Sequence, residues 1–307
     1  MTAAPPGSRR RGRFAPSPTG PLHFGSLVAA VGSFADARAA GGEWLVRMED
    51  LDRPRTVPGA ADDILRGLDA FGLHWDASVW YQTGRTEAYV TALERLSAAG
   101  LVYACGCTRR EIQLGGRPGP EGPIYPGTCR RGLPAGRAPR SLRLRADGSE
   151  IGFVDRVHGP QQQDVARAVG DFVLRRADGF YAYQLAVVVD DAAQGITDVV
   201  RGADLLLSTP RQIRLQRHLG LPQPTYAHLP LALDASGRKL SKSLAALPVE
   251  RSDPLPALLA AWRFLGQCPP PEPPGDVAAF WAWAVHAWDV TRIPSCITHP
   301  AVEAAER

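Results

Sequence analysis

Short apolar runs that alternate with segments of helical periodicity are the feature that most constrains the fold of this chain. Runs typical of β-strands occur at residues 43–48 (EWLVRM), 183–189 (YQLAVVV) and 228–233 (HLPLAL). Apolar residues spaced three and four apart indicate helices over residues 64–71 and 89–96, which end at Gly72 and Gly100. Strands alternating with helices predict a parallel sheet covered by helices, with ligands beyond the carboxyl ends of the strands. Glu49 directly follows the first run, so we expect it at such a site.

Residues 13–26 (RFAPSPTGPLHFGS) have the composition of a phosphate-binding turn. Prolines stiffen the segment, Gly20 and Gly25 permit close approach to the backbone, and a helical apolar pattern begins after Ser26. A strand, a tight turn and a helix N-terminus in this order present backbone N–H groups to an anion. His23 can donate a hydrogen bond to a phosphate there. Loops rich in Gly and Pro also occur without this function.

The only two lysines of the chain, Lys239 and Lys242, lie three residues apart in the segment KLSKS. The other 33 of the 35 basic residues are Arg, so lysine is used only where a compact ammonium is needed. Two ammonium groups beside the hydroxyl groups of Ser241 and Ser243 suit a triphosphate whose charge grows during displacement at phosphorus. Chance placement in an exposed loop is the alternative.

Three of the five cysteines are close in sequence: Cys105, Cys107 and, after a loop rich in Gly and Pro, Cys129. This spacing fits a zinc-stabilised knuckle, which we favour over three reduced buried cysteines or a redox pair. Cys268 and Cys296 have no ligand-like spacing.

Composition places the chain among soluble globular proteins, with 45% hydrophobic and 21% charged residues. No apolar run approaches the roughly 18 residues of a membrane span, and the N-terminus lacks the apolar core of a secretory signal. We therefore expect a cytoplasmic protein without a membrane partner. The net charge of +4 is too small to indicate nucleic acid by itself. The sequence does not fix the oligomeric state, and a monomer is favoured.

Together these segments resemble the class I aminoacyl-tRNA synthetases. Residues 23–26 (HFGS) and 239–243 (KLSKS) are similar to the HIGH and KMSKS signatures of that family, with Ser26 in place of the last His and Leu240 in place of Met. Residues 13–20 (RFAPSPTG), 47–52 (RMEDLD) and 200–204 (VRGAD) are similar to its glutamyl branch. The resemblance covers nearly everything from Arg13 to Ser243 and implies a Rossmann-like doubly wound parallel sheet as the catalytic domain, residues 13–243.

The resemblance also implies roles for individual residues. It implies that ATP, accompanied by Mg²⁺, is bound by a set of signature residues: His23, Gly25, Ser26, Lys239, Ser241 and Lys242. Lys242, Lys239 and His23 would stabilise the transition state. Glutamate would be held by Arg13, Phe14, Ala15, Pro16, Ser17, Glu49, Tyr183 and Arg201. The charges agree, because Arg can pair with a carboxylate at two points and Glu49 can pair with an ammonium; a surface ion pair is the alternative for each Arg.

Truncated members of the glutamyl branch are similar to this chain in the cysteine segment and supply a tyrosine there. The resemblance therefore implies Tyr125 as the fourth zinc ligand beside Cys105, Cys107 and Cys129, within an insertion over residues 104–165. The pattern of residues 244–307 predicts a short helical C-terminal region, which the prolines of residues 268–275 interrupt. Apolar stripes at residues 255–265 and 277–288 predict core helices. We expect no anticodon-binding domain.

Those truncated relatives are the glutamyl-queuosine tRNA(Asp) synthetases, which place glutamate on queuosine. The resemblance thus implies ATP and glutamate as substrates and queuosine-carrying tRNA(Asp) as the partner. A minimal synthetase that acylates a tRNA 3′ end is one alternative. A non-catalytic RNA-binding or regulatory paralogue is the other, and the Ser26 departure is the best argument for it.

Overall fold

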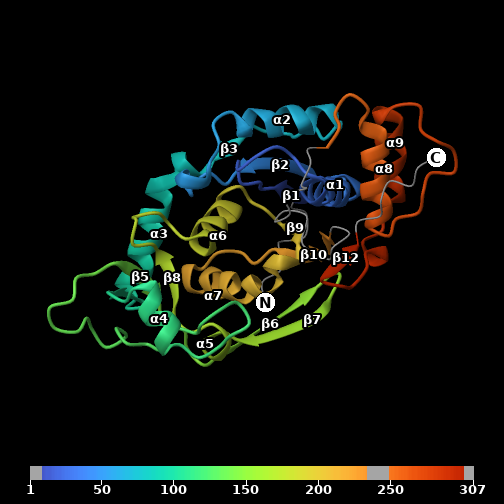
Figure 1. Cartoon of the computed structure of the whole chain (residues 1–307). Coiled ribbons are helices and arrows are strands. Elements are labelled where there is room, and N and C mark those ends of the chain that lie inside the picture. Colours follow the sequence, from blue (N-terminus) through green and yellow to red (C-terminus); the bar gives the residue numbers. More distant parts are fainter. Residues whose placement is uncertain (1–8, 234–248, 301–307) are drawn as a thin grey trace.

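The fold is described from a computed structural model of the chain, which describes residues 9–233 and 249–300. Parallel strands form its centre (Figure 1). One sheet has the order β1-β2-β3, with β1 (Arg11–Phe14), β2 (Glu43–Met48) and β3 (Trp80–Tyr81). The other has the order β7-β6-β10-β9, with β6 (Glu150–Asp155), β7 (Gly159–Asp164), β9 (Asp198–Gly202) and β10 (Thr225–Leu229). The two sheets meet between β1 and β9, where Thr197 N donates to Arg11 O at 3.0 Å.

Helices cover both faces of these strands. Successive residues of one strand point to different cores, as Val46 packs with α1 (Phe24–Ala39) while Leu45 packs with α3 (Thr86–Ala98). The first core also contains α2 (Ala60–Ala70), α8 (Pro254–Phe264) and α9 (Val277–Ala287). The second contains α6 (Tyr183–Ala193) and α7 (Thr209–Leu219). This arrangement confirms the predicted doubly wound α/β fold.

Several predicted boundaries are confirmed, and their causes are local. The helix expected at residues 64–71 is α2, and the chain turns after it at Gly72, whose φ of +66° favours glycine. A Cβ at Gly72 would also lie 2.6 Å from Val277 Cγ1 of α9. The helix expected before Gly100 is α3. The C-terminal stripes form core, with Leu258, Trp262 and Phe280 fully buried.

The strand predicted at residues 183–189 is wrong, because this segment forms helix α6. The helix is buried on several sides, with Leu185, Ala186, Val187 and Val188 all inaccessible, so its sequence lacks the polar stripe of a surface helix. A continuous short apolar run is then compatible with either a strand or a buried helix. The run at residues 228–233 is divided between β10 and β11 (Leu231–Leu233), on either side of Pro230.

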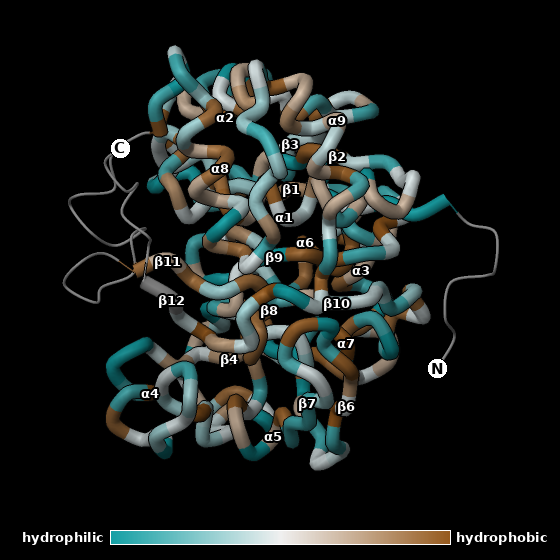
Figure 2. The backbone as a smooth tube through the Cα atoms, turned by 90° about the vertical axis from the view of Figure 1, so that its right-hand side faces the viewer, coloured by the Kyte–Doolittle hydropathy of each residue, from teal (hydrophilic) through white to brown (hydrophobic). Residues whose placement is uncertain are grey.

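The remaining elements surround the sheet. A three-stranded sheet has the order β4-β5-β8, with β4 (Val102–Cys105), β5 (Ser141–Leu144) and β8 (Phe172–Arg175). The loop between β4 and β5 carries α4 (Arg109–Gly115), and α5 (Val165–Ala168) precedes β8. The pair β11 and β12 (Thr298–Pro300) is parallel. Figures 1 and 2 place α4 and the α8–α9 pair at opposite ends of the molecule.

Residues 104–165, predicted as an insertion, contribute β6, which joins the central strands through β10. Because this strand belongs to the central sheet, the pairing does not separate residues 104–165 from the rest of the fold. The boundaries of the insertion and of the domains stay predictions. Among the helices of the described residues, none has the length and apolar character needed to cross a membrane.

Candidate functional site

A cavity of about 580 Å³, the first cavity, lies beyond the carboxyl ends of β1, β2 and β9. Seven of the eight residues expected to hold glutamate line it: Arg13, Phe14, Ala15, Ser17, Glu49, Tyr183 and Arg201. The eighth, Pro16, lies beside them, and its carbonyl oxygen accepts a 2.9 Å hydrogen bond from Glu49 N. The structure thus brings this whole set together from four separate segments of the chain.

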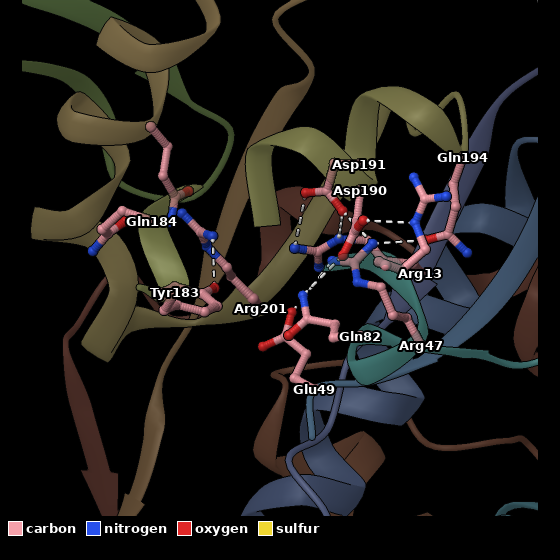
Figure 3. A network of polar contacts seen from close by, with 12 residues as sticks. Arg13, Arg47, Glu49, Gln82, Tyr183, Gln184, Asp190, Asp191, Gln194 and Arg201 are labelled. Atoms are coloured by element: carbon pink, nitrogen blue, oxygen red, sulfur yellow. Dashed lines mark hydrogen bonds and ion pairs between the residues drawn. The ribbon is translucent and has the colours of Figure 1, made fainter. Parts of the chain in front are cut away.

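Two arginines and two carboxylates form a buried network along one side of the first cavity (Figure 3). Arg13 Nε lies 3.2 Å from Asp191 Oδ1, and Arg47 Nη1 lies 2.8 Å from the same oxygen. Arg47 also contacts Glu49 Oε1 at 3.3 Å and donates to Gln194 Oε1 at 2.6 Å. Burial raises the pKa of Asp191, but Arg13 and Arg47 outweigh burial and hold that pKa below its usual range. Asp191 is thus a carboxylate that partly neutralises both arginines.

Glu49 has the opposite electrostatic balance. Burial raises the pKa of its carboxyl above the usual value, and the attraction of Arg47 and Arg13 offsets this only in part. A cation placed beside Glu49 would therefore stabilise the ionised carboxylate. The geometry favours a ligand that brings an ammonium group to this end of the first cavity.

Arg201 lies across the cavity from this network, next to Tyr183 (Figure 3). The residue is 5% exposed, and its guanidinium has neutral partners: Tyr183 Oη at 3.3 Å, Thr209 Oγ1 at 2.8 Å and His228 Nε2 at 3.1 Å. Within residues 9–233 and 249–300, no carboxylate lies within ion-pair distance of Arg201. A buried cation without an anionic partner is costly, so this position favours an anionic ligand.

A second cavity, of about 410 Å³, adjoins the first and shares Ser17, Ala29, Arg55, Gly202 and Asp204 with it. The N-terminus of α1 opens into it through His23, Gly25 and Ser26. His23 is the N-cap residue of α1. Its Nδ1 accepts from Ser26 N at 3.2 Å, and Ser26 Oγ accepts from His23 N at 2.8 Å. Ser26 therefore has a local role in capping the helix that points its positive end into this cavity.

Lys239, Ser241 and Lys242 lie outside the described residues. Leu231 and Ala232, which precede that segment, line the second cavity. The roles of the two lysines and the serine stay predictions from the sequence.

The side chains of Cys105, Cys107, Tyr125 and Cys129 converge in the knuckle between β4 and β5. The three sulfurs lie within 4.8 Å of one another, with Cys107 Sγ 3.7 Å from Cys129 Sγ. Tyr125 Oη lies 3.3 Å from Cys105 Sγ and 3.6 Å from Cys107 Sγ. Zn–S bonds of about 2.3 Å place tetrahedral thiolates roughly 3.8 Å apart, so these spacings fit a tetrahedral metal.

The surroundings of this cluster favour a thiolate. Burial raises the pKa of Cys105, but hydrogen bonding with Tyr125 and the Cys107 backbone, together with Arg143, lowers it to about 7. Arg143 also lies over the Tyr125 ring, 4.0 Å from its centre. Burial raises the pKa of Cys107, which a metal would have to offset.

Sequence reasoning missed Arg47, Asp191 and Gln194, which orient Arg13 and Glu49. Arg47 carried a usable signal, because a charged residue inside the apolar run EWLVRM must be paired if that strand is buried. Asp191 lies just after the run of residues 183–189 that was predicted as a strand, and helix α6 places it at the site. Asp155 and His228, whose buried side chains lie 2.6 Å apart behind Arg201, had no signal in the sequence pattern.

Comparison with known proteins agrees with this geometry. A family model described as the catalytic domain of class I tRNA synthetases (E and Q) matches residues 10–254. The glutamyl-Q tRNA(Asp) synthetase of Dechloromonas aromatica (strain RCB) is 60% identical over 296 residues, which cover 95% of this chain and 98% of that protein. The protein of the same name from Geobacter sulfurreducens is 55% identical over 293 residues, covering 92% of this chain and 93% of that protein.

Solved structures support the fold. A glutamate tRNA ligase from Elizabethkingia meningosepticum, crystallised with its amino acid, superposes with a TM-score of 0.78 and 23% identity. The superposition covers 96% of this chain and 67% of that one. At this identity the likeness bears on the fold alone.

Proposed function

Since this chain belongs to the class I tRNA synthetases (E and Q) and is a ligase of that type, we propose that it activates glutamate with ATP and transfers it to queuosine in tRNA(Asp). The acceptor is supported by relatives at 55–60% identity that bear the name glutamyl-Q tRNA(Asp) synthetase. The amino acid is supported by the charges of the first cavity. The single observation that carries it is Arg201, a buried guanidinium whose described partners are all neutral.

Glutamate has two carboxylates and one ammonium, and the first cavity offers a matching group for each. Arg201, with Tyr183 beside it, takes the side-chain carboxylate, because the Arg201 charge has no carboxylate among the described residues to neutralise it. Glu49 takes the ammonium, which lowers the raised pKa of its carboxyl. Arg13 lines the same cavity and faces the α-carboxylate of glutamate. Asp191 already neutralises part of the Arg13 charge, so Arg13 attracts this carboxylate less strongly than an unpaired arginine would. Glutamine would leave Arg201 buried without an anion and is disfavoured.

In the activation step, an oxygen of the glutamate α-carboxylate attacks the α-phosphorus of ATP, and pyrophosphate leaves. The attacking carboxylate is already ionised at neutral pH, so no general base is needed. Catalysis then consists of alignment and stabilisation of charge. His23 and the N-terminus of α1 face the second cavity, where the phosphates would lie, and Lys239 and Lys242 join them on the grounds of sequence alone. Mg²⁺ accompanies the nucleotide.

In the transfer step, a hydroxyl group of the acceptor attacks the activated carbonyl carbon, and AMP leaves. The cyclopentene-diol of queuosine offers such hydroxyls in the same way as a ribose. A tRNA 3′ end is the competing acceptor, and a protein that performs neither step is the non-catalytic alternative.

Zinc has a structural part in this proposal. Cys105, Cys107, Cys129 and Tyr125 would hold it, and their spacing fits a tetrahedral site. When bound, the ion would cross-link the β4–β5 loop, which has little other core, and none of its four ligands lines the first cavity.

Glutamate-dependent ATP–pyrophosphate exchange tests the activation step. We expect exchange with glutamate and not with glutamine, and its loss in Lys242→Ala with an unchanged thermal unfolding midpoint. Normal exchange in Lys242→Ala would remove the role given to that lysine. Absence of exchange in the wild type would contradict the proposed function.

A further inference from the structure

We propose that His228, held by Asp155, is a positioning residue that fixes the orientation of Arg201 in the first cavity without neutralising its charge. Both residues are outside the cavity lining and were not among the predicted site residues. The inference rests on the proposed function, in which Arg201 binds the side-chain carboxylate of glutamate.

Asp155 and His228 form a fully buried pair between adjacent strands. Asp155 ends β6, His228 lies in β10, and the side chains of both are 0% exposed. The imidazole Nδ1 lies 2.6 Å from Asp155 Oδ2. Asp155 Oδ1 also accepts from the backbone N–H groups of Val157 and His158, each at 3.0 Å. These backbone hydrogen bonds fix the orientation of the Asp155 carboxylate independently of the imidazole.

This contact determines which ring nitrogen carries the proton. With Nδ1–H donating to the Asp155 carboxylate, a neutral imidazole presents a lone pair at Nε2. Arg201 Nε donates to that nitrogen at 3.1 Å. Arg201 itself cannot accept a hydrogen bond, so the bond requires the neutral ring with its proton on Nδ1. Burial lowers the pKa of His228 to about 4 and agrees with a neutral ring at physiological pH.

A third contact completes the orientation of the guanidinium. Arg201 Nη2 donates to Thr209 Oγ1 at 2.8 Å, and Thr209 Oγ1 lies 3.2 Å from Leu205 O, to which it can donate. With Nε and Nη2 held from behind, Nη1 faces Tyr183 and the cavity. The protein uses an imidazole where a carboxylate would be the ordinary partner of a buried arginine. Asp155 lies on the opposite side of the His228 ring from Arg201. It therefore orients the imidazole, while the charge of Arg201 stays available to a ligand.

Two variants separate positioning from plain structural support. In His228→Asn, the new side-chain amide reaches the position of Nδ1 and can keep the Asp155 contact, but it cannot reach Arg201. In His228→Gln, the longer amide reaches the position of Nε2 and can accept from Arg201, but it leaves the Nδ1 position unoccupied. We therefore compare His228→Asn, His228→Gln and His228→Ala by glutamate-dependent ATP–pyrophosphate exchange.

We expect His228→Asn and His228→Ala to raise the KM for glutamate about tenfold or more, the typical effect of losing a hydrogen bond to a charged group. The KM for ATP should stay at the wild-type value. His228→Gln should recover most of the affinity for glutamate. A wild-type KM for glutamate in His228→Asn, or equal KM values in the Asn and Gln variants, overturns the positioning role. A wild-type protein without exchange overturns the proposed function and, with it, this role.

A measurement on the wild type covers the case in which the variants do not fold. In ¹⁵N-histidine-labelled protein, one neutral histidine should have its proton on Nδ1 and should not titrate between about pH 5.5 and 8. If every neutral histidine carries its proton on Nε2, Arg201 cannot donate to His228 and the proposal is wrong.

Discussion

Arg13 and Asp191 form a buried two-point ion pair, with Arg13 Nε 3.2 Å from Asp191 Oδ1 and Arg13 Nη2 3.4 Å from Asp191 Oδ2. Arg13, the arginine of the segment RFAPSPTG, thus already has a carboxylate of the protein as its partner. Asp191 also serves Arg47, whose side chain is 0% exposed. One carboxylate therefore holds two strands, β1 and β2, against helix α6.

Replacement of Asp191 by Asn should destabilise the protein strongly, because it leaves two buried guanidinium groups with too little negative charge. Breaking a buried pair from one side costs about 3–5 kcal/mol. Urea unfolding of Asp191→Asn measures the loss. Asp178→Asn is the matched control, since Asp178 pairs with Arg176 at the surface and its side chain is 42% exposed. Equal unfolding midpoints for the two variants would contradict the role given to Asp191.

Arg201→Leu should abolish saturation by glutamate while the protein stays folded. Removal of the charge that meets the substrate carboxylate costs about 2–5 kcal/mol, so the KM for glutamate should rise about 30-fold or more. Pyrophosphate exchange at increasing glutamate concentrations gives this value. Arg167→Leu serves as control, because the Arg167 side chain is 88% exposed and pairs with Asp164 at the start of its own short helix. If both variants have the wild-type KM, Arg201 does not bind the substrate.

Purified protein should contain about one zinc ion per chain. Metal analysis of Cys129→Ser should show loss of that zinc together with a lower thermal midpoint, because the ion would connect a loop with a small core. Cys268→Ser should keep both values, since Cys268 is exposed and distant in sequence from the cluster. Wild-type protein without bound zinc, prepared without chelators, would exclude the metal site.

Stability should fall as the pH is lowered from about 6.5 to 4. Burial holds the pKa of His228 at about 4, below its usual 6.5, with Arg201 and His158 adding to this effect and Asp155 opposing it. The unfolded chain therefore binds a proton in this window that the folded chain does not, which is worth on the order of 3 kcal/mol once pH is below 4. Thermal unfolding of the wild type and His228→Gln between pH 7 and pH 4 measures it. A wild-type slope no steeper than that of the variant would contradict a neutral buried His228.

The sequence was sufficient for the fold class because its strongest signals are local. The turn of residues 13–26, the strand EWLVRM and the helix ending at Gly72 each form from short-range preferences and appear where predicted. Helix α6 is buried on several sides and lacks a polar stripe, so its apolar run has the pattern of a strand. A strand at this position does not predict the ion pairs of Asp190 and Asp191. In helix α6, Asp190 pairs with Arg85 and Asp191 pairs with Arg13.

The candidate site was predictable residue by residue only where the family resemblance implied it. Arg13, Glu49 and Arg201 lie in segments that resemble the glutamyl branch, Tyr183 was implied with them, and all four line one cavity. Asp155 and His228 lie 73 residues apart and meet only because β6 and β10 are neighbours. No local pattern encodes which strands become neighbours, so this support for Arg201 is visible only in the folded chain.

Queuosine is the proposed acceptor of the activated glutamate. The most direct test of this proposal is incubation of the protein with ATP, labelled glutamate and tRNA(Asp), prepared with and without queuosine. We expect label on the queuosine-containing tRNA(Asp) only, and release of that label when the modified nucleoside is removed. Equal labelling of both preparations, with the label at the 3′ end, would contradict it and identify a minimal glutamyl-tRNA synthetase.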